Sequence, residues 1–336
     1  MKIFFLFLSI ISRQVFSQEL HFEEIKIDTN YSFRGLSVVD DSIAWVSGNG
    51  FGRSVNGGKN WSFKKVKNFE KLDFRTLYAF DGLTAIIANA GSPAYILRTE
   101  DGGENWIEVY RNNDSLAFFD GIDFWNEKEG IIYGDPIKGR MLLLQTKDGG
   151  KSWLELPEKD RPQCMEGEAS FAASGTSIRC YDKQKVIIAT GGKVSRLFIL
   201  SHKGQKWNSI STPITQGRNS TGIFSFAFFN DSSGIIVGGD YLIDTMKTAH
   251  TFYTADSGKS WSFPVSPTGG YRECVEFIND KTAIAVGPGG ADISENGGKD
   301  WLPLENEKSF HVIRKARKGK LVIAAGIKKI SLVTIK

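Results

Sequence analysis

The chain has 336 residues, of which 41% are hydrophobic and 24% are charged, and its formal net charge at pH 7 is +4. This composition is that of an ordinary soluble globular protein, long enough to bury a large core. A net charge this small gives no argument for binding nucleic acid or an anionic membrane, so an electrostatic partner would have to be recognised by a local patch.

The first residues have the order of an export signal. Lys2 provides the charged start, residues 3–11 form an apolar run, and Val15 and Ser17 occupy the small-residue positions before a cleavage site. The apolar run is shorter than the roughly 20 residues that span a bilayer. We therefore predict a signal peptide over residues 1–17 and a mature domain over residues 18–336 that is periplasmic or secreted, without stable membrane insertion.

The cysteines and histidines do not form a recognisable metal or redox motif. Cys164, Cys180 and Cys274 are an odd number for an exported protein, so at most one intramolecular disulfide can form. None of them has CxxC or metal-ligand spacing, and the four histidines are scattered. The cysteines are interpreted as small buried apolar residues, and we expect no metal and no cofactor.

One phrase recurs along the sequence. TEDGGENW at residues 99–106 returns as SVNGGKNW, TKDGGKSW, TADSGKSW and SENGGKDW, and a shortened copy, SHKGQKW, ends at Trp207. The repeated tryptophans stand at positions 61, 106, 153, 207, 261 and 301. Steps of about 40 to 50 residues are typical of the four-stranded blades of a β-propeller.

Each repeat predicts four short antiparallel strands followed by the same turn chemistry. In the phrase at residues 99–106, the Thr99 hydroxyl and the Asp101 carboxylate can accept hydrogen bonds from backbone N–H groups of a tight turn, while Gly102 and Gly103 supply positive φ angles. Trp106 then begins the outer strand and can pack against the neighbouring blade.

The two ends of the sequence complete the ring. Residues 310–336 supply three more strands without an outer one, and residues 20–27 (LHFEEIKI) alternate like the outer strands of the other units. Joining the termini in one blade leaves no exposed sheet edge. We predict an all-β, seven-bladed propeller whose last blade is closed by the N-terminal strand.

The repeated phrases resemble Asp-boxes, also called bacterial neuraminidase repeats. The order of the units resembles the exported propellers of the photosystem II stability/assembly factor-like family, whose relatives are sometimes labelled oxidoreductases. The segments that carry this resemblance are GEASFAASGTSI at 167–178, residues 222–241 and GYRECVEF at 270–277. The fourth box departs from the pattern, because it lacks one residue and has Lys203 where Asp is usual.

The resemblance implies an arginine patch that holds a protein partner on the face opposite the repeated hairpins. Aligning the inner strands by the Gly that closes each second strand gives one equivalent position per blade, namely Arg34, Arg75, Asp120, Ser177, Phe224, Arg272 and His311. Blades six, seven, one and two would then place Arg272, His311, Arg34 and Arg75 on one arc at the channel mouth, with Asp120 beyond it.

Such an arc predicts an anion pocket. Arginine forks bind carboxylates through two parallel hydrogen bonds, so an acidic peptide, the terminal carboxylate of a polypeptide or an acidic sugar would fit. The alternative is that each arginine pairs with a neighbouring acid, such as Asp120 or Glu273, in a solvated channel.

Loops on the same face add further candidates. Arg140 lies in the GDPIKGR turn and Arg196 in the GGKVSR turn. The connection at residues 157–170 is expected to bring Glu168 towards the channel. The loop at residues 238–250 is long enough to be a lid or a specificity element, although a tolerated insertion is the alternative.

The sequence is compatible with two functions, and a third is unsupported. The preferred one is a monomeric, non-catalytic binding or assembly-factor-like propeller for an acidic protein segment or an acidic glycan. The alternative is a sialidase-like glycoside hydrolase acting on acidic sugars, with Glu168, Asp135, Asp240 and Tyr241 as candidate catalytic residues. FRGL at residues 33–36 lacks the Pro of the sialidase Phe-Arg-Ile-Pro signature, however. An oxidoreductase is unsupported, because GNGFGRS at residues 48–54 links two strands and opens no helix.

Overall fold

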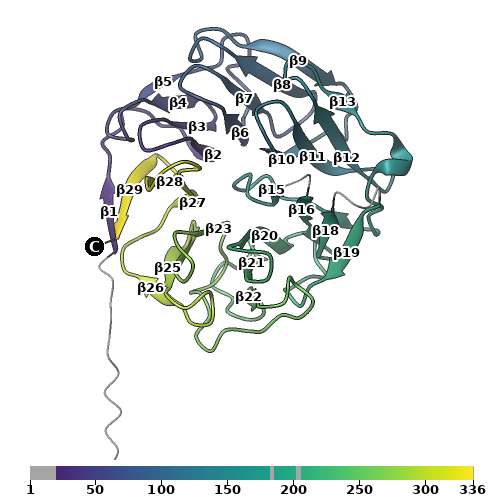
Figure 1. Cartoon of the computed structure of the whole chain (residues 1–336), viewed down its shortest axis with the longest axis vertical. Helices are drawn as coiled ribbons and strands as arrows, with labels where there is room; N and C mark the ends of the chain where they lie inside the picture. The colour runs from purple at the N-terminus through teal and green to yellow at the C-terminus, as the bar shows by residue number, and fades with distance from the viewer. Residues whose placement is uncertain (1–19, 182–184, 202–205, 336) are drawn as a thin grey trace, which may run out of the picture.

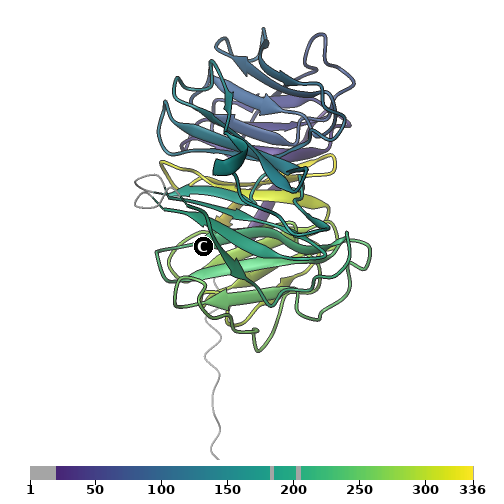
Figure 2. The same cartoon turned by 90° about the vertical axis from the view of Figure 1, so that its right-hand side faces the viewer.

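The computed structural model describes residues 20–335 apart from 182–184 and 202–205. Seven antiparallel sheets surround a central axis (Figure 1). Seen edge-on in Figure 2, the molecule is narrower than in the face view. The predicted signal peptide, residues 1–17, lies outside the described residues. Among the residues that are described, no helix is long and apolar enough to cross a bilayer.

The blades are numbered in sequence order and their strands are given from the inner to the outer one. Blade 1 contains β2 (Phe33–Val38), β3 (Ala44–Gly48), β4 (Phe51–Ser54) and β5 (Ser62–Lys64). Blade 2 contains β6 (Thr76–Ala79), β7 (Ala85–Ala88), β8 (Ala94–Thr99) and β9 (Ile107–Asn112). Blade 3 contains β10 (Phe119–Phe124), β11 (Gly130–Ile137), β12 (Arg140–Thr146) and β13 (Leu154–Glu155). Blade 4 contains β15 (Ile178–Tyr181), β16 (Lys185–Ala189), β18 (Arg196–Leu200) and β19 (Asn208–Ser211).

The remaining blades follow the same order. Blade 5 contains β20 (Thr221–Phe228), β21 (Gly234–Asp240) and β22 (Thr251–Thr254), and its sheet is extended by β14 (Glu168–Ala169) and β17 (Gly191–Gly192). Blade 6 contains β23 (Cys274–Phe277), β24 (Ala283–Gly287), β25 (Gly290–Ser294) and β26 (Leu302–Leu304). Blade 7 contains β27 (Phe310–Lys315), β28 (Val322–Gly326), β29 (Lys329–Ile335) and β1 (Leu20–Glu24). A single turn of 3-10 helix lies at Glu158–Asp160.

The N-terminal strand closes the ring, as the sequence predicts. β1 pairs antiparallel with β29, with Leu20 opposite Ile335 and Glu24 opposite Ser331. In Figure 1 the purple β1 lies beside the yellow β29. The first and last segments of the propeller therefore share one sheet, which confirms the seven-bladed architecture and its mode of closure.

Blade 5 departs from the prediction of four strands per unit. Its outer strand is reduced to one bridge between Tyr253 and Ser262. The backbone then turns to blade 6, where the Trp301 amide donates to the Ser266 carbonyl at 2.8 Å. Pro264 and Pro267 lie in this stretch, and a proline has no N–H with which to continue a ladder.

The repeated hairpins have the predicted hydrogen bonds. In the second of them the Thr99 hydroxyl accepts from the Gly103 amide at 3.0 Å, and the Asp101 carboxylate accepts from the Asn105 amide at 3.0 Å. Gly102 and Gly103 have φ angles of 80° and 88°. Hydrogen bonds from the Asn105 backbone and side chain lower the pKa of Asp101 to about 2. The shortened fourth phrase includes residues 202–205, which lie outside the described residues.

Tryptophan side chains join neighbouring blades. Trp106 of blade 2 meets Phe51 of blade 1 edge-on, with ring centroids 5.3 Å apart, and it also contacts Trp45. Trp45 and Phe51 are buried in the same apolar cluster as Ile87 of blade 2. The core therefore lies between blades, where each sheet covers the face of the next, and the predicted role of Trp106 is confirmed.

The three cysteines are free thiols. Cys164 and Cys274 are buried and Cys180 is partly exposed. Burial accounts for the raised pKa of the Cys164 thiol, which reaches about 12, so this thiol stays protonated at neutral pH. The structure agrees with the interpretation of Cys164 and Cys274 as small apolar core residues.

Candidate functional site

The channel has two mouths. We call the side where the inner strands begin the start face, and the side where they end, together with the repeated hairpins, the hairpin face. The predicted arginine arc belongs to the start face. Bulges in β2, β10, β20 and β27 place Arg34, Asp120, Phe224 and His311 at one equivalent position.

In blade 6 the residue at this equivalent position is an acid and not an arginine. Cys274 pairs with Val286, the residue before the closing Gly287, so the equivalent position is Glu273. Arg272 lies one residue earlier and its side chain is 4% exposed. Its Nε donates to Asp292 at 2.6 Å and its Nη1 to the Tyr271 carbonyl. The prediction that Arg272 lines the channel mouth is therefore wrong.

Glu273 neutralises the arc that was predicted to bind anions. Its Oε2 accepts from Arg34 Nη1 at 2.9 Å and contacts His311 Nδ1 at 2.7 Å, while its Oε1 accepts from the Tyr271 hydroxyl. Arg75 is paired in the same way, with Nε 2.7 Å from Asp73 Oδ2. For both arginines the structure matches the alternative, in which each cation pairs with a nearby acid.

The protein's own backbone occupies this mouth. Residues 171–176 lead from β14 to β15, and in Figure 1 the segment before β15 turns inside the ring. Arg34 Nη1 donates to the Ala173 carbonyl at 3.0 Å, and the Ser174 hydroxyl donates to the Glu273 carbonyl at 2.8 Å. Phe171 stacks on Phe224 with ring centroids 3.9 Å apart. The segment fills the place that the sequence assigned to an anionic ligand.

Asp120 is buried beside this mouth. Neither of its carboxylate oxygens has a hydrogen-bond partner among the described residues. Burial raises the pKa of Asp120 well above its usual value, the neighbouring Asp135 raises it further, and Arg75 opposes the shift. Burial also raises the pKa of Asp135, whose Oδ1 accepts from the Ser170 amide at 2.9 Å.

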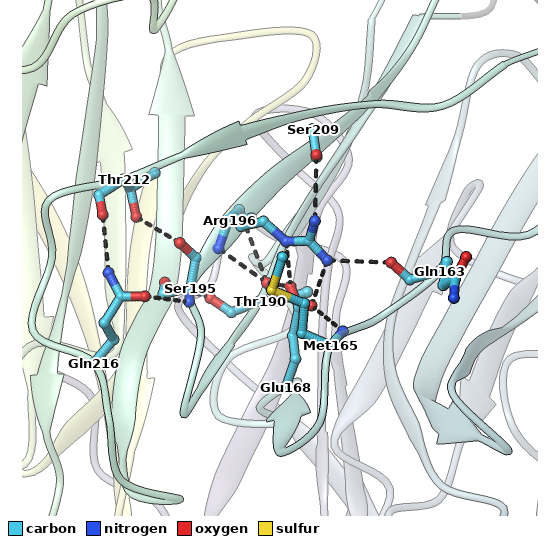
Figure 3. Close-up of polar contacts among 9 residues, drawn as sticks. All are labelled: Gln163, Met165, Glu168, Thr190, Ser195, Arg196, Ser209, Thr212 and Gln216. Carbon is cyan, nitrogen blue, oxygen red and sulfur yellow. Dashed lines mark hydrogen bonds and ion pairs between the residues drawn. The ribbon is translucent and has the colours of Figure 1, made fainter.

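Glu168 and Arg196 were predicted separately, one as a catalytic acid and the other as a binding residue, and they pair with each other (Figure 3). Arg196 donates from Nε to Glu168 Oε1 at 3.1 Å and from Nη2 to Oε2 at 2.5 Å. Glu168 also accepts from the Thr190 hydroxyl and the Met165 amide. Both side chains are buried, so this network fastens residues 163–168 to blade 4.

The other candidates on this face do not converge on one site. Arg140 Nη1 donates to the Arg161 carbonyl at 3.1 Å. Asp240 lies 3.6 Å from Arg218 and accepts from the Leu242 amide, while Tyr241 is 48% exposed. Within the described part of the protein, no hydrogen bond or ion pair joins any two of the four predicted hydrolase residues. The loop at residues 238–250 presents Tyr241, Leu242 and Ile243 to solvent.

A cavity of about 440 Å³ lies at the opposite mouth, on the hairpin face. We call it the central cavity. All seven inner strands or the turns that follow them contribute to its wall. Its charged lining residues are Asp123, Arg179, Glu276, Arg314, Lys315 and Arg317. Its aromatic lining residues are Tyr78, Phe124, Tyr181, Phe228, Phe229 and Phe277.

The cations of the central cavity are only partly neutralised. Four basic side chains face two acids, Asp123 and Glu276. Arg179 lies 2.5 Å from Glu276, whereas Arg314 lies 3.6 Å from it. The Asp123 carboxylate accepts from the Cys180 and Phe124 amides at 2.7 and 2.9 Å. Burial raises the pKa of Asp123, and the hydrogen bonds from the Cys180 and Phe124 amides oppose this shift.

Two arginine groups in this cavity retain hydrogen-bonding capacity. Arg314 makes the loose contact with Glu276 and no hydrogen bond to any other described residue, and Arg179 Nε is buried without a partner. Arg317 is held by donating to the Ser37 hydroxyl and by lying 4.4 Å from the Tyr78 ring. Lys315 donates to the Ile278 carbonyl at 2.7 Å. Arg314 therefore retains guanidinium N–H donors for which no described residue is a hydrogen-bond acceptor.

Sequence reasoning missed this cavity, although one signal was present. Residues 314–320 read RKARKGK, which puts five basic side chains into seven positions at the β27–β28 turn. A run of charges usually marks a solvated surface, and nothing in the sequence shows that this turn borders the axis. Arg179 is two residues out of register with the predicted arc, and it lines the other mouth.

No protein-family model matches this chain, and no curated protein matches it in sequence. Among solved structures, YCF48 bound to D1 peptide is similar to it with 17% identity and a TM-score of 0.68, over 94% of this chain and 97% of that one. YCF48 from Cyanidioschyzon merolae has 14% identity and a TM-score of 0.68, over 93% and 98% of the two chains. The likeness shows the fold. The GH74 enzyme of Niastella koreensis has 10% identity and a TM-score of 0.57, and the match covers 88% of this chain and 51% of that one.

Proposed function

We propose that this protein is an exported, non-catalytic binding protein whose central cavity holds a carboxylate-bearing segment of a partner protein. One observation carries the proposal. Arg314 borders a cavity in which four cations face two acids, and its guanidinium makes no hydrogen bond to another described residue. Export is part of the proposal and follows from the signal-like order of residues 1–17.

The chemistry of the wall favours an acidic group attached to an apolar one. A guanidinium presents two parallel N–H donors that match a carboxylate, and a partly desolvated site strengthens that pairing. The aromatic side chains offer a surface for an apolar neighbour, and Phe229 is 45% exposed at the rim. Arginine and aromatic residues together are typical of protein interfaces. A volume of about 440 Å³ is within the usual range for ligand pockets.

The fold supports a protein partner in preference to a sugar. A propeller similar to this one over nearly its whole length is described as bound to a D1 peptide. The candidate acids of the hydrolase alternative are engaged elsewhere, Glu168 with Arg196 and Asp240 with Arg218. This arrangement favours recognition over hydrolysis. Because Arg34 and Arg75 are paired with acids on the start face, we place the proposed arginine site on the hairpin face.

Fluorescence anisotropy with a short labelled peptide tests the proposal. The probe contains Glu, Ser and Leu, and matched versions replace Glu by Gln and the C-terminal carboxylate by an amide. Arg314→Met should weaken binding of the carboxylate probe about tenfold or more, because a hydrogen bond to a charged group is worth about 1.5–3 kcal/mol. A probe that carries both replacements, and so has no carboxylate, should bind the wild-type protein as weakly as the carboxylate probe binds Arg314→Met.

Arg218→Met is the matched control. Arg218 is also an arginine with a single loose contact, 3.6 Å from Asp240, but it lies on the start face and is 70% exposed. Its replacement should leave the affinity unchanged. Equal affinities of Arg314→Met and wild type for the carboxylate probe would overturn the proposal.

A further inference from the structure

A second cavity of about 900 Å³ adjoins the central cavity on the hairpin face. We call it the lysine groove. Turns of blades 6, 7 and 1 form it together with parts of β28 and β29, and Lys315 lines both cavities. Its lining residues are Asp41, Ser42, Asn56, Gly57, Lys59, Ile278, Asn279, Lys315, Lys320, Leu321, Val322, Leu332, Val333 and Thr334.

The groove combines positive charge with an apolar floor. Lys59 and Lys320 are exposed, and no ion pair to another described residue holds either of them. Asp41, the one acid in the lining, uses its Oδ1 to accept from the Lys320 and Leu321 amides at 2.5 and 2.8 Å. Asp41 keeps its negative charge, because these hydrogen bonds lower its pKa, and the lining still has more cations than acids, with Lys59, Lys315 and Lys320 beside it.

The basic turn at residues 314–320 connects the two cavities. Arg314, Lys315 and Arg317 face the central cavity, while Lys315 and Lys320 face the groove. A peptide that leaves the central cavity across this turn would pass from arginines to lysines. It would lie on the apolar side chains of Ile278, Leu321 and Leu332.

We infer that the lysine groove holds the continuation of the same partner segment, as an extended acidic stretch whose Asp or Glu side chains meet Lys59 and Lys320. This inference rests on the proposed function, because the central cavity supplies the anchor. The apolar floor favours a peptide over a nucleic-acid backbone, for which the small net charge of +4 gives no general attraction.

Two probes separate the groove from the central cavity. The short probe is the labelled carboxylate peptide described above, and the long probe adds an acidic, Leu-containing stretch upstream. We expect the long probe to bind the wild type roughly fivefold more tightly than the short one, as a few partly exposed charge pairs allow. The double variant Lys59→Gln/Lys320→Gln should abolish this gain and leave the short probe unaffected. Lys138→Gln/Lys247→Gln, on exposed start-face lysines, is the matched control and should retain the gain.

The outcomes distinguish the two levels of the proposal. Undiminished affinity of Lys59→Gln/Lys320→Gln for the long probe would overturn the groove inference, while Arg314→Met with the short probe still reports on the proposed function. Equal gain from a long probe with Gln in place of the upstream Glu would also overturn it. If a DNA duplex displaced the labelled long probe as effectively as the unlabelled long probe does, the groove would be assigned to nucleic acid. If the wild type formed dimers that the lysine variant abolishes, the groove would be assigned to a second copy of the protein.

Discussion

Arg196→Met tests whether Glu168 stabilises the fold or performs chemistry. Arg196 makes two hydrogen bonds to Glu168, one to the Gln163 carbonyl at 3.1 Å and one to the Ser209 hydroxyl at 3.3 Å. Methionine keeps most of the aliphatic volume and removes all four. Glu168 then remains buried with the Thr190 hydroxyl and the Met165 amide as its partners. Breaking one side of a buried ion pair costs about 3–5 kcal/mol, and we expect a loss of this size in the free energy of unfolding.

Urea denaturation, followed by tryptophan fluorescence and circular dichroism, measures the loss. The double variant Glu168→Gln/Arg196→Met is the decisive comparison, because it removes the stranded charge as well as the cation. It should recover about 1–3 kcal/mol relative to Arg196→Met. A single variant that loses less than about 1 kcal/mol, or a double variant no more stable than the single one, would refute this reasoning. A hydrolase with Glu168 as its acid would instead lose turnover of a fluorogenic glycoside in Glu168→Gln without loss of stability.

Three further changes test other parts of the structure. Burial raises the pKa of Asp120 in the folded protein, so stability is highest when Asp120 is protonated and falls as pH rises through its folded-state pKa. Asp120→Asn should therefore stabilise the protein by about 1–3 kcal/mol at alkaline pH and by little at acidic pH, and an unchanged pH profile of the melting temperature would contradict this. Thr99→Val removes the acceptor of the buried Gly103 amide and should cost about 1–3 kcal/mol in urea denaturation, whereas an unaltered midpoint would count against the hairpin's role. Deleting residues 18–24 exposes the edge of β29 and should cause aggregation in light scattering, which a synthetic peptide of the deleted strand reverses; a monodisperse deletion variant would disprove the closure.

The fold was predictable because local chemistry repeats. Thr99, Asp101 and the two following glycines specify one hairpin through contacts within a few residues, and the same letters recur in other blades. The alternation in residues 20–27 marked the strand that closes blade 7. The short outer edge of blade 5 was missed, although the two prolines there were a usable signal.

The site was harder to predict because its position depends on register and on distant segments. A slip of one residue in blade 6 exchanges Glu273 for Arg272, which reverses the charge at the channel mouth. No periodic pattern indicates that residues 171–176 fill that mouth. The central cavity gathers residues from seven strands, so Arg179 and Arg314 lie far apart in the sequence and meet at Glu276 through the closure of the ring.

Site-specific photocrosslinking tests the central claim most directly. Phe229 and Tyr241 are a matched pair, because they are 45% and 48% exposed aromatic residues on the hairpin face and the start face. A benzoylphenylalanine is introduced at either position and irradiated with the short carboxylate probe. The proposed site predicts a crosslink from position 229 that excess unlabelled probe suppresses, and none from position 241. A crosslink from position 241 with none from position 229 would contradict binding in the central cavity.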